Sequence, residues 1–200
     1  MAYDSAATRE RILKAATAEF AEHGVAGARV DRVAARAKAN KRAIYEYFGD
    51  KKALFTAVIE QLMTEVAEAV PPDGGDPAAY AERLYEYNRA HPETLRLLMW
   101  EALEAGDEPV PNERERAAHY QDKAAALAAA DPVVEPRAFA LYVLALVSWP
   151  LAMPQLHRML MGEDASPDDL RPALRAAVTA LTSGGQGRGP RSEGASADGQ

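Results

Sequence analysis

The feature that most constrains the fold is a pair of short apolar-periodic segments separated by a tight break, within residues 28–55. In the first segment, Val33 and Ala37 lie four residues apart and give a short helix one small, apolar face. In the second, Ile44 and Phe48 have the same spacing and are expected to point inward. This layout predicts a helix-turn-helix, in which the second helix lies in the major groove of DNA.

Residues that favour helix ends flank both segments. Gly24 is expected to end a first helix in the left-handed conformation, and Asn40 is a suitable N-cap for the second short helix. After Gly49 breaks the chain, Asp50 is expected to cap a longer helix that runs on to a proline- and glycine-rich stop at 71–75. These signals predict a helical domain at the start of the chain, which is called the head, and the rest of the chain is called the body.

The remaining residues also favour helix, because Ala, Leu, Glu and Arg dominate and alternating β-branched runs are missing. We therefore expect an all-α protein with about nine helices. Asn112, with Glu115 three residues later, predicts a capping box. The predicted divisions are a DNA-binding domain at 6–66 with its helix-turn-helix at about 29–48, a second helical domain at 76–182, and a disordered tail at 183–200.

Charge is distributed unevenly along the chain. The net charge is −7, but residues 1–55 hold 11 Lys and Arg against 7 Asp and Glu, a net charge of +4. Residues 56–200 hold 12 Lys and Arg against 23 Asp and Glu, a net charge of −11. A basic head can attract the phosphates of DNA locally, while an acidic body keeps the protein soluble and repels DNA.

Composition excludes several classes of protein. The chain has no cysteine, so disulfides and cysteine-based zinc sites are excluded and a cytoplasmic location is expected. No run of about 18 apolar residues exists, and the charged N-terminus is unlike a signal peptide, so no membrane association is expected. Because His23, His91, His119 and His157 form no i, i+4 pair, neither a metal nor a cofactor is expected.

The segment 139–149 is apolar around most of its circumference, so a helix there must be buried on more than one side. Burial inside a monomer would satisfy this pattern, and so would burial between two copies. Pro150 and Pro154 each remove a backbone donor and are expected to kink or split the helix at 137–161. A kink among large apolar residues favours a pocket.

The head contains a set of residues in a defined order and spacing: Ile12, Ala15, Phe20, Gly24, Val33, Ala34, Ala37, Lys41, Ile44, Tyr45, Phe48, Asp50, Lys51, Leu54 and Phe55. Through this order and spacing, residues 9–55 resemble the DNA-binding domain of TetR-type (tetracycline-repressor-like) regulators. Lys38 stands where that family usually has glycine in the turn, so either Lys38 takes a positive φ at some energetic cost or the turn differs slightly. Ala28 and Arg29 stand where the family has a small hydroxyl residue, which removes a cap and adds a cation.

The resemblance implies a sequence-specific transcriptional regulator and not an enzyme: a homodimeric repressor that a small-molecule effector releases from a palindromic operator. The second domain is then expected to bind the effector and to dimerise through the last two helices, at about 137–161 and 167–182. Arg can read guanine, whereas Lys and Tyr more often contact phosphate. The residues expected to contact DNA are Arg29, Arg32, Asn40, Lys41, Arg42, Tyr45, Tyr47 and Lys51.

A mainly apolar effector pocket with a few polar groups is expected around the two prolines. Aromatic and methionine side chains at helical spacing also form ordinary core, and the cations of the head could be plain solvated charge, so both alternatives stay open. The predicted pocket lining is Tyr85, Met99, Trp100, Tyr120, Tyr142, Trp149 and Met153.

Two other functions fit parts of the sequence. A helical small-molecule-binding protein or enzyme could carry an incidental helix-turn-helix, but no nucleophile–base arrangement, metal cluster or phosphate loop is apparent. Glu101, Glu104 and His119 could meet as an acid–base group, although nothing in their spacing requires it. An architectural protein that bends DNA would lack the preference of about 10³ or more that a regulator shows for its palindrome.

Overall fold

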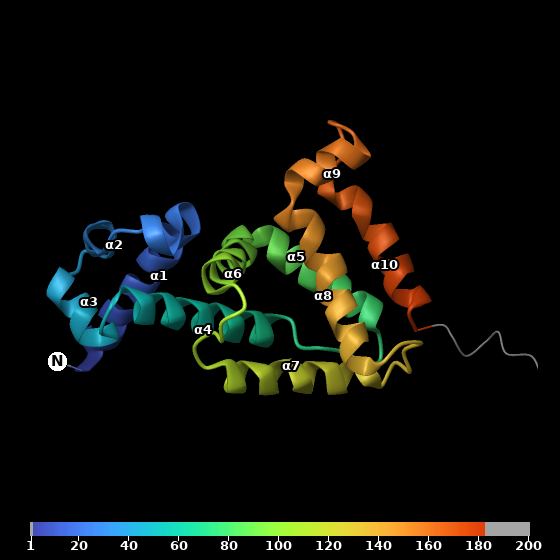
Figure 1. The fold of residues 1–200 in the computed structure, drawn as a ribbon, viewed down its shortest axis with the longest axis horizontal. Coiled ribbons are helices and arrows are strands. Elements are labelled where there is room, and N and C mark those ends of the chain that lie inside the picture. The colour runs from blue at the N-terminus through green and yellow to red at the C-terminus, as the bar shows by residue number, and fades with distance from the viewer. Residues whose placement is uncertain (1, 183–200) are drawn as a thin grey trace, which may run out of the picture.

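Ten α-helices and one short 3-10 helix make up the computed structural model, which describes residues 2–182 (Figure 1). The all-α prediction is therefore confirmed, whereas the predicted disordered tail at 183–200 lies outside the described residues. The helices are α1 (Ala2–Gly27), α2 (Val30–Ala37), α3 (Lys41–Phe48), α4 (Lys51–Ala69), α5 (Pro77–Ala90), α6 (Pro92–Ala105), α7 (Glu113–Ala128), α8 (Pro136–Ala152), α9 (Pro154–Met161), η1 (Pro167–Leu170) and α10 (Arg171–Ala180).

Gly24 bends α1 near its end, at the position where the sequence predicts a break. Its φ of 66° and ψ of −179° lie in a region that is almost exclusive to glycine. A Cβ at this position would lie 3.0 Å from ring atoms of Trp100. The bend therefore lets α6 approach α1 closely and brings the head and the body into contact.

The turn between α2 and α3 follows the predicted chemistry. Lys38 takes the left-handed conformation, with φ 51° and ψ 42°, at a cost of about 1 kcal/mol relative to glycine. Asn40 accepts a hydrogen bond from the Arg42 N–H at 2.9 Å, and Asp50 accepts one from the Ala53 N–H at 2.8 Å. Both predicted N-caps are thus confirmed.

The capping box predicted at Asn112 is wrong. Asn112 has a φ of 55°, outside the extended conformation that an N-cap needs, and its side chain makes no cap hydrogen bond. Its amide donates instead to the carboxylate of Glu60 on α4. Glu113, the first residue of α7, accepts a hydrogen bond from the Val110 N–H of the preceding loop at 3.0 Å.

Pro154 splits the helix predicted at 137–161 into α8 and α9, which explains why the described residues form ten α-helices instead of about nine. Pro154 stands at the first position of α9, where a missing N–H costs no hydrogen bond. Pro150, by contrast, stays inside α8. Within the described part of the chain, no single helix is long and apolar enough to cross a membrane, and α8 and α9 reach that limit only as a pair bent by 86°.

Two apolar cores lie along the molecule. The first core is formed by the four helices α1, α2, α3 and α4, and it includes Leu97 of α6, which is fully buried. The second joins α5, α7, α8 and α10 around Tyr80, Leu127 and Phe139. α4 runs from the head along the body, and α6 packs against α1 and α4 (Figure 1). These two helices therefore connect the DNA-facing end of the molecule to its body.

Candidate nucleic-acid interface and effector cavity

α3 is anchored on one side and presents polar side chains on the other. Ile44 is 1% exposed and belongs to the first core, and Phe48 packs against that core. This one-sided burial is what a helix in the major groove requires. The predicted contact residues of this segment are all exposed: Asn40, Lys41, Arg42, Tyr45 and Tyr47.

Two cations on α3 already have carboxylate partners. Lys41 Nζ lies 2.9 Å from Asp31, and the hydrogen bond to that carboxylate raises the pKa of Lys41. Arg42 Nε donates to Glu46 at 2.7 Å, one turn further along the helix. Because both pairs are exposed, they contribute little to stability and can exchange the carboxylate for a phosphate or a base edge.

A buried carboxylate that was not predicted from the sequence braces the head. Glu19 on α1 is 2% exposed and accepts hydrogen bonds from the Arg29 N–H at 2.9 Å and from Arg32 Nε at 2.7 Å. Arg32, predicted to contact DNA, is thus held by the protein itself, with 41% of its side chain exposed. The sequence did carry a signal, because Glu19 falls between Ala16 and Phe20 on the apolar stripe of α1, where an unpaired carboxylate would be costly.

Lys51 and Arg29 border one edge of the head. Lys51 Nζ donates to the carbonyl oxygens of Ala26 and Ala28, at 3.4 Å and 3.3 Å. The exposed side chain of Arg29 follows directly after Ala28. Lys51 and Arg29, both predicted to contact DNA, therefore lie together at the junction of α1, α2 and α4.

Replacing Glu19 by Gln is expected to lower the free energy of unfolding by about 1–2 kcal/mol at neutral pH, a modest loss for a buried charge because Arg32 is partly exposed. Burial alone raises the pKa of Glu19, but the hydrogen bonds from Arg32 and Arg29 outweigh it, and the pKa is lowered. A carboxyl whose pKa falls on folding stabilises the protein above its ordinary pKa, and this contribution is lost as the pH falls through the lowered value. Urea unfolding of the wild type and of Glu19→Gln at neutral and acidic pH measures this contribution. If the difference in unfolding free energy between the two proteins does not become smaller at acidic pH, the assignment is contradicted.

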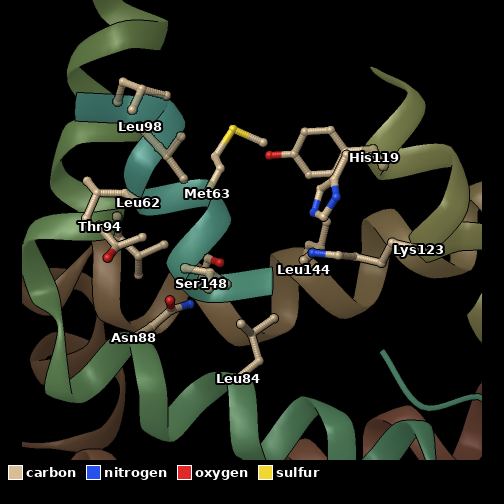
Figure 2. A pocket seen from close by; sticks show the side chains of 14 residues that line it. Leu62, Met63, Leu84, Asn88, Thr94, Leu98, His119, Lys123, Leu144 and Ser148 are labelled. Carbon is tan, nitrogen blue, oxygen red and sulfur yellow. The ribbon is translucent and has the colours of Figure 1, made fainter. Parts of the chain in front are cut away.

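A cavity of about 190 Å³ lies in the body between α4, α5, α6, α7 and α8 (Figure 2). Its wall is mainly aliphatic, with leucines from four of these helices. An apolar wall with a few polar groups is the usual character of a small-molecule site. The polar and aromatic side chains in this wall are Asn88, Thr94, His119, Tyr120, Lys123 and Ser148.

Of the seven predicted effector residues, Tyr120 is the one that lines this cavity. Tyr85 is 1% exposed within the second core, and Trp100 packs on Gly24 of α1. Met99 borders a separate groove near the junction of α8 and α9. Of the predicted residues on α5 and α6, Tyr85 therefore lies in the second core, Trp100 lies between head and body, and Met99 lies at a separate groove.

The orientation of α8 accounts for the other three. Leu144 and Ser148 face the cavity from this helix. Tyr142 and Trp149 face away from it and are 47% and 56% exposed, and Met153 lies beyond the end of the helix. A helix that is apolar all round gives no sequence signal for which face turns inward.

The acid–base group considered from the sequence does not form. Glu101 is paired with Arg116 through two hydrogen bonds of 2.8 Å and 2.7 Å that join α6 to α7. Burial, and then the charge of Lys123, lower the pKa of His119. Within the described residues, no three His, Cys, Asp or Glu side chains are placed to bind a metal ion.

An exposed cationic helix on a three-helix head, joined to a helical body that encloses a cavity, defines the class as a helix-turn-helix transcriptional regulator. Residues 12–58 match the family model for bacterial regulatory proteins of the tetR family, and residues 76–181 match the model for the tetracyclin repressor-like C-terminal domain. The chain belongs to the TetR family of transcriptional regulators.

The similarity to individual relatives spans both halves of the chain. The HTH-type transcriptional repressor SCO4008 of Streptomyces coelicolor is 45% identical over 185 residues, which cover 88% of this chain and 96% of that protein. The repressor Rv3405c of Mycobacterium tuberculosis is 29% identical, over 85% of this chain and 86% of its own length. The crystal structure of the putative transcriptional regulator SCO4942 from Streptomyces coelicolor superposes with a TM-score of 0.74 at 32% identity, over 87% of this chain and 97% of that one.

Proposed function

We propose that this regulator is a repressor that binds a palindromic operator as a homodimer through α3, and that a small, largely apolar effector in the cavity releases it. The observation that carries the proposal is the position of the cavity. Its wall is built partly from α4 and α6, the two helices that also contribute to the core of the head. The relatives SCO4008 and Rv3405c are repressors, which supports this direction of regulation.

In the proposed complex, the exposed face of α3 lies in the major groove. Arg42 is placed to read a base edge once it leaves Glu46, because its guanidinium can donate two parallel hydrogen bonds to guanine. Phosphate contacts come from the surrounding cations and hydroxyls. These are Arg29, Arg32, Lys41, Tyr45, Tyr47 and Lys51, with the amide of Asn40 at the start of the helix.

The proposed dimer surface is the outer face of α8 together with α10. The opposite face of α8 is buried in the second core, so one copy of the chain covers only half of this apolar helix. α10 adds small exposed residues, including Ala173 and Ala176, which allow close helix approach. An exposed apolar stripe of this length marks an interaction surface. On α8 it consists of Leu141, Tyr142, Leu146 and Trp149, which are 37% to 63% exposed.

The proposed coupling runs through α4 and α6. Leu62 on α4 and Leu98 on α6 line the cavity, whereas the neighbouring Leu97 is buried in the core of the head and Trp100 packs on Gly24. A ligand that moves these helices apart changes the angle of the head, and hence the spacing of the two heads in a dimer. The resulting loss of operator affinity equals the ligand's difference in affinity for the two spacings, commonly about 1–3 kcal/mol.

Selection of bound duplexes from a random DNA pool tests the proposal. We expect enrichment of a palindrome with two half-sites one helical turn or more apart, preferred over random DNA by about 10³ or more. Binding without enrichment would favour an architectural DNA-binding protein instead. No binding in dilute buffer, or an enriched site without two-fold symmetry, would contradict the proposed mode of recognition.

A further inference from the structure

Lys123 on α7 is a buried cation without a carboxylate partner. It is 7% exposed, and among residues 2–182 no Asp or Glu forms an ion pair with it. Its ammonium lies 5.6 Å from the centre of the Tyr120 ring, a contact that offsets only part of the lost hydration. A buried ammonium is unfavourable unless a counter-charge reaches it. None of the described carboxylates supplies that counter-charge.

The residue type at this position is also unusual for this chain. Lys123 is the only lysine among residues 56–200, where every other cation is an arginine. A lysine can lay its four-carbon stem along an apolar wall and project a compact charge from the end. Figure 2 shows its side chain reaching into the cavity beside His119. The charge is therefore directed at the space that a ligand would occupy.

The opposite side of the cavity carries two buried polar side chains, one of which is unsatisfied among the described residues. Thr94 on α6 is 4% exposed, and within the part of the chain that the structure describes its Oγ1 has no hydrogen-bond partner. Asn88 on α5 is 5% exposed and lines the same wall, across the cavity from Lys123 (Figure 2). A buried hydroxyl without a partner is unfavourable in the free protein. The cavity is thus cationic at one end and able to form hydrogen bonds at the other.

The surroundings limit how much negative charge a ligand can carry. The groove between α4 and α7 that adjoins the cavity is lined by three glutamates and one cation, Arg116. The groove between α7 and α8 has Lys123 and Arg137 as its charged lining residues, with no carboxylate among them. A ligand with several negative charges would be repelled by the glutamates of the groove between α4 and α7. A single anionic group beside Lys123 would instead face the groove between α7 and α8, whose lining has no carboxylate.

We propose that the effector is a small monocarboxylate with an apolar body, whose carboxylate pairs with Lys123 and whose body contacts the leucines of the cavity wall. A hydrogen-bonding group at its far end meets Thr94. This inference rests on the proposed function, which supplies the premise that the cavity binds an effector. Burial lowers the pKa of Lys123 in the free protein, and a bound carboxylate would counter this loss by stabilising the charged form.

Matched pairs of acids and amides test the assignment on the full-length protein by calorimetry. The pairs are benzoate and benzamide, phenylacetate and phenylacetamide, cinnamate and cinnamamide, and octanoate and octanamide. Within each pair the body is the same and the charge differs. At least one acid is expected to bind the wild type about tenfold or more tightly than its amide. Lys123→Met should abolish this preference, whereas Lys14→Met, which removes an exposed lysine of α1, should retain it.

Thermal unfolding without ligand gives a second, independent readout. Lys123→Met is expected to melt at a higher temperature than the wild type, because a buried charge without a partner has been removed. A lower melting temperature would overturn the proposal, since the ammonium would then stabilise the empty protein. The proposal is also overturned if no acid is preferred over its amide, or if the preference survives in Lys123→Met.

Operator binding in the presence of the same compounds separates this inference from the proposed function. An acid that binds through Lys123 without weakening operator binding supports the ligand class and contradicts the effector role of the cavity. Release of the operator by an amide as effectively as by its acid supports the effector role and overturns the carboxylate assignment.

Discussion

Replacing both Leu141 and Trp149 by Glu is expected to yield a monomer at micromolar concentration and to lower operator affinity by about 100-fold or more. These side chains are 63% and 56% exposed on the outer face of α8. Carboxylates placed between two copies would lose hydration without gaining partners. Two joined heads bind neighbouring half-sites with an effective concentration that a single head lacks, a gain of about 10²–10⁴-fold in linked binders.

Sedimentation velocity and titration of the selected palindrome measure the two effects together. Leu103→Glu is the matched control, because Leu103 is 73% exposed on α6 and is not part of the proposed surface of α8 and α10. It should leave both the dimer and the operator affinity unchanged. A wild type that sediments as a monomer, or a double variant that still dimerises, would rule out the α8 surface.

The second large effect is expected from Arg42→Ala. Removal of its guanidinium should relax sequence preference at one or two base positions in each half-site, at a cost of about 1–3 kcal/mol there. Affinity for random DNA should change much less, because Arg42 is expected to read a base and not the backbone. Titrations with the palindrome and with its single-base variants measure this. Arg36→Ala is the control, since Arg36 is an exposed arginine of α2 that lies outside the predicted contacts.

Lys51→Ala is expected to act differently, weakening binding to all sequences alike and reducing the dependence of log affinity on log salt by about 1. Its ammonium already lies against the carbonyl oxygens of Ala26 and Ala28, so it is held at the edge of the head before DNA arrives. Lys52→Ala removes the adjacent exposed lysine and serves as the control. Unchanged affinity in both Arg42→Ala and Lys51→Ala would refute the proposed DNA interface.

Local signals were sufficient to predict the head. Gly24, Lys38, Asn40 and Asp50 act on backbone groups within a few residues of themselves, so the breaks, the left-handed turn and the caps could be predicted without knowledge of the fold. Asn112 shows where this approach fails. Asparagine is a residue type that caps helices well, but the side-chain amide of Asn112 donates to Glu60, which lies 52 residues away in the sequence.

The sequence by itself determined that this chain is all-helical, that it carries a helix-turn-helix and that positive charge gathers at that end, because spacing, caps and charge are local properties. Only the tertiary structure decided which face of α8 turns inward, and therefore that Trp149 faces solvent while Ser148 faces the cavity. It alone brought Lys123 of α7 and Thr94 of α6 to one space. Such choices depend on how side chains from distant helices fill a common volume, and no short stretch of sequence contains that information.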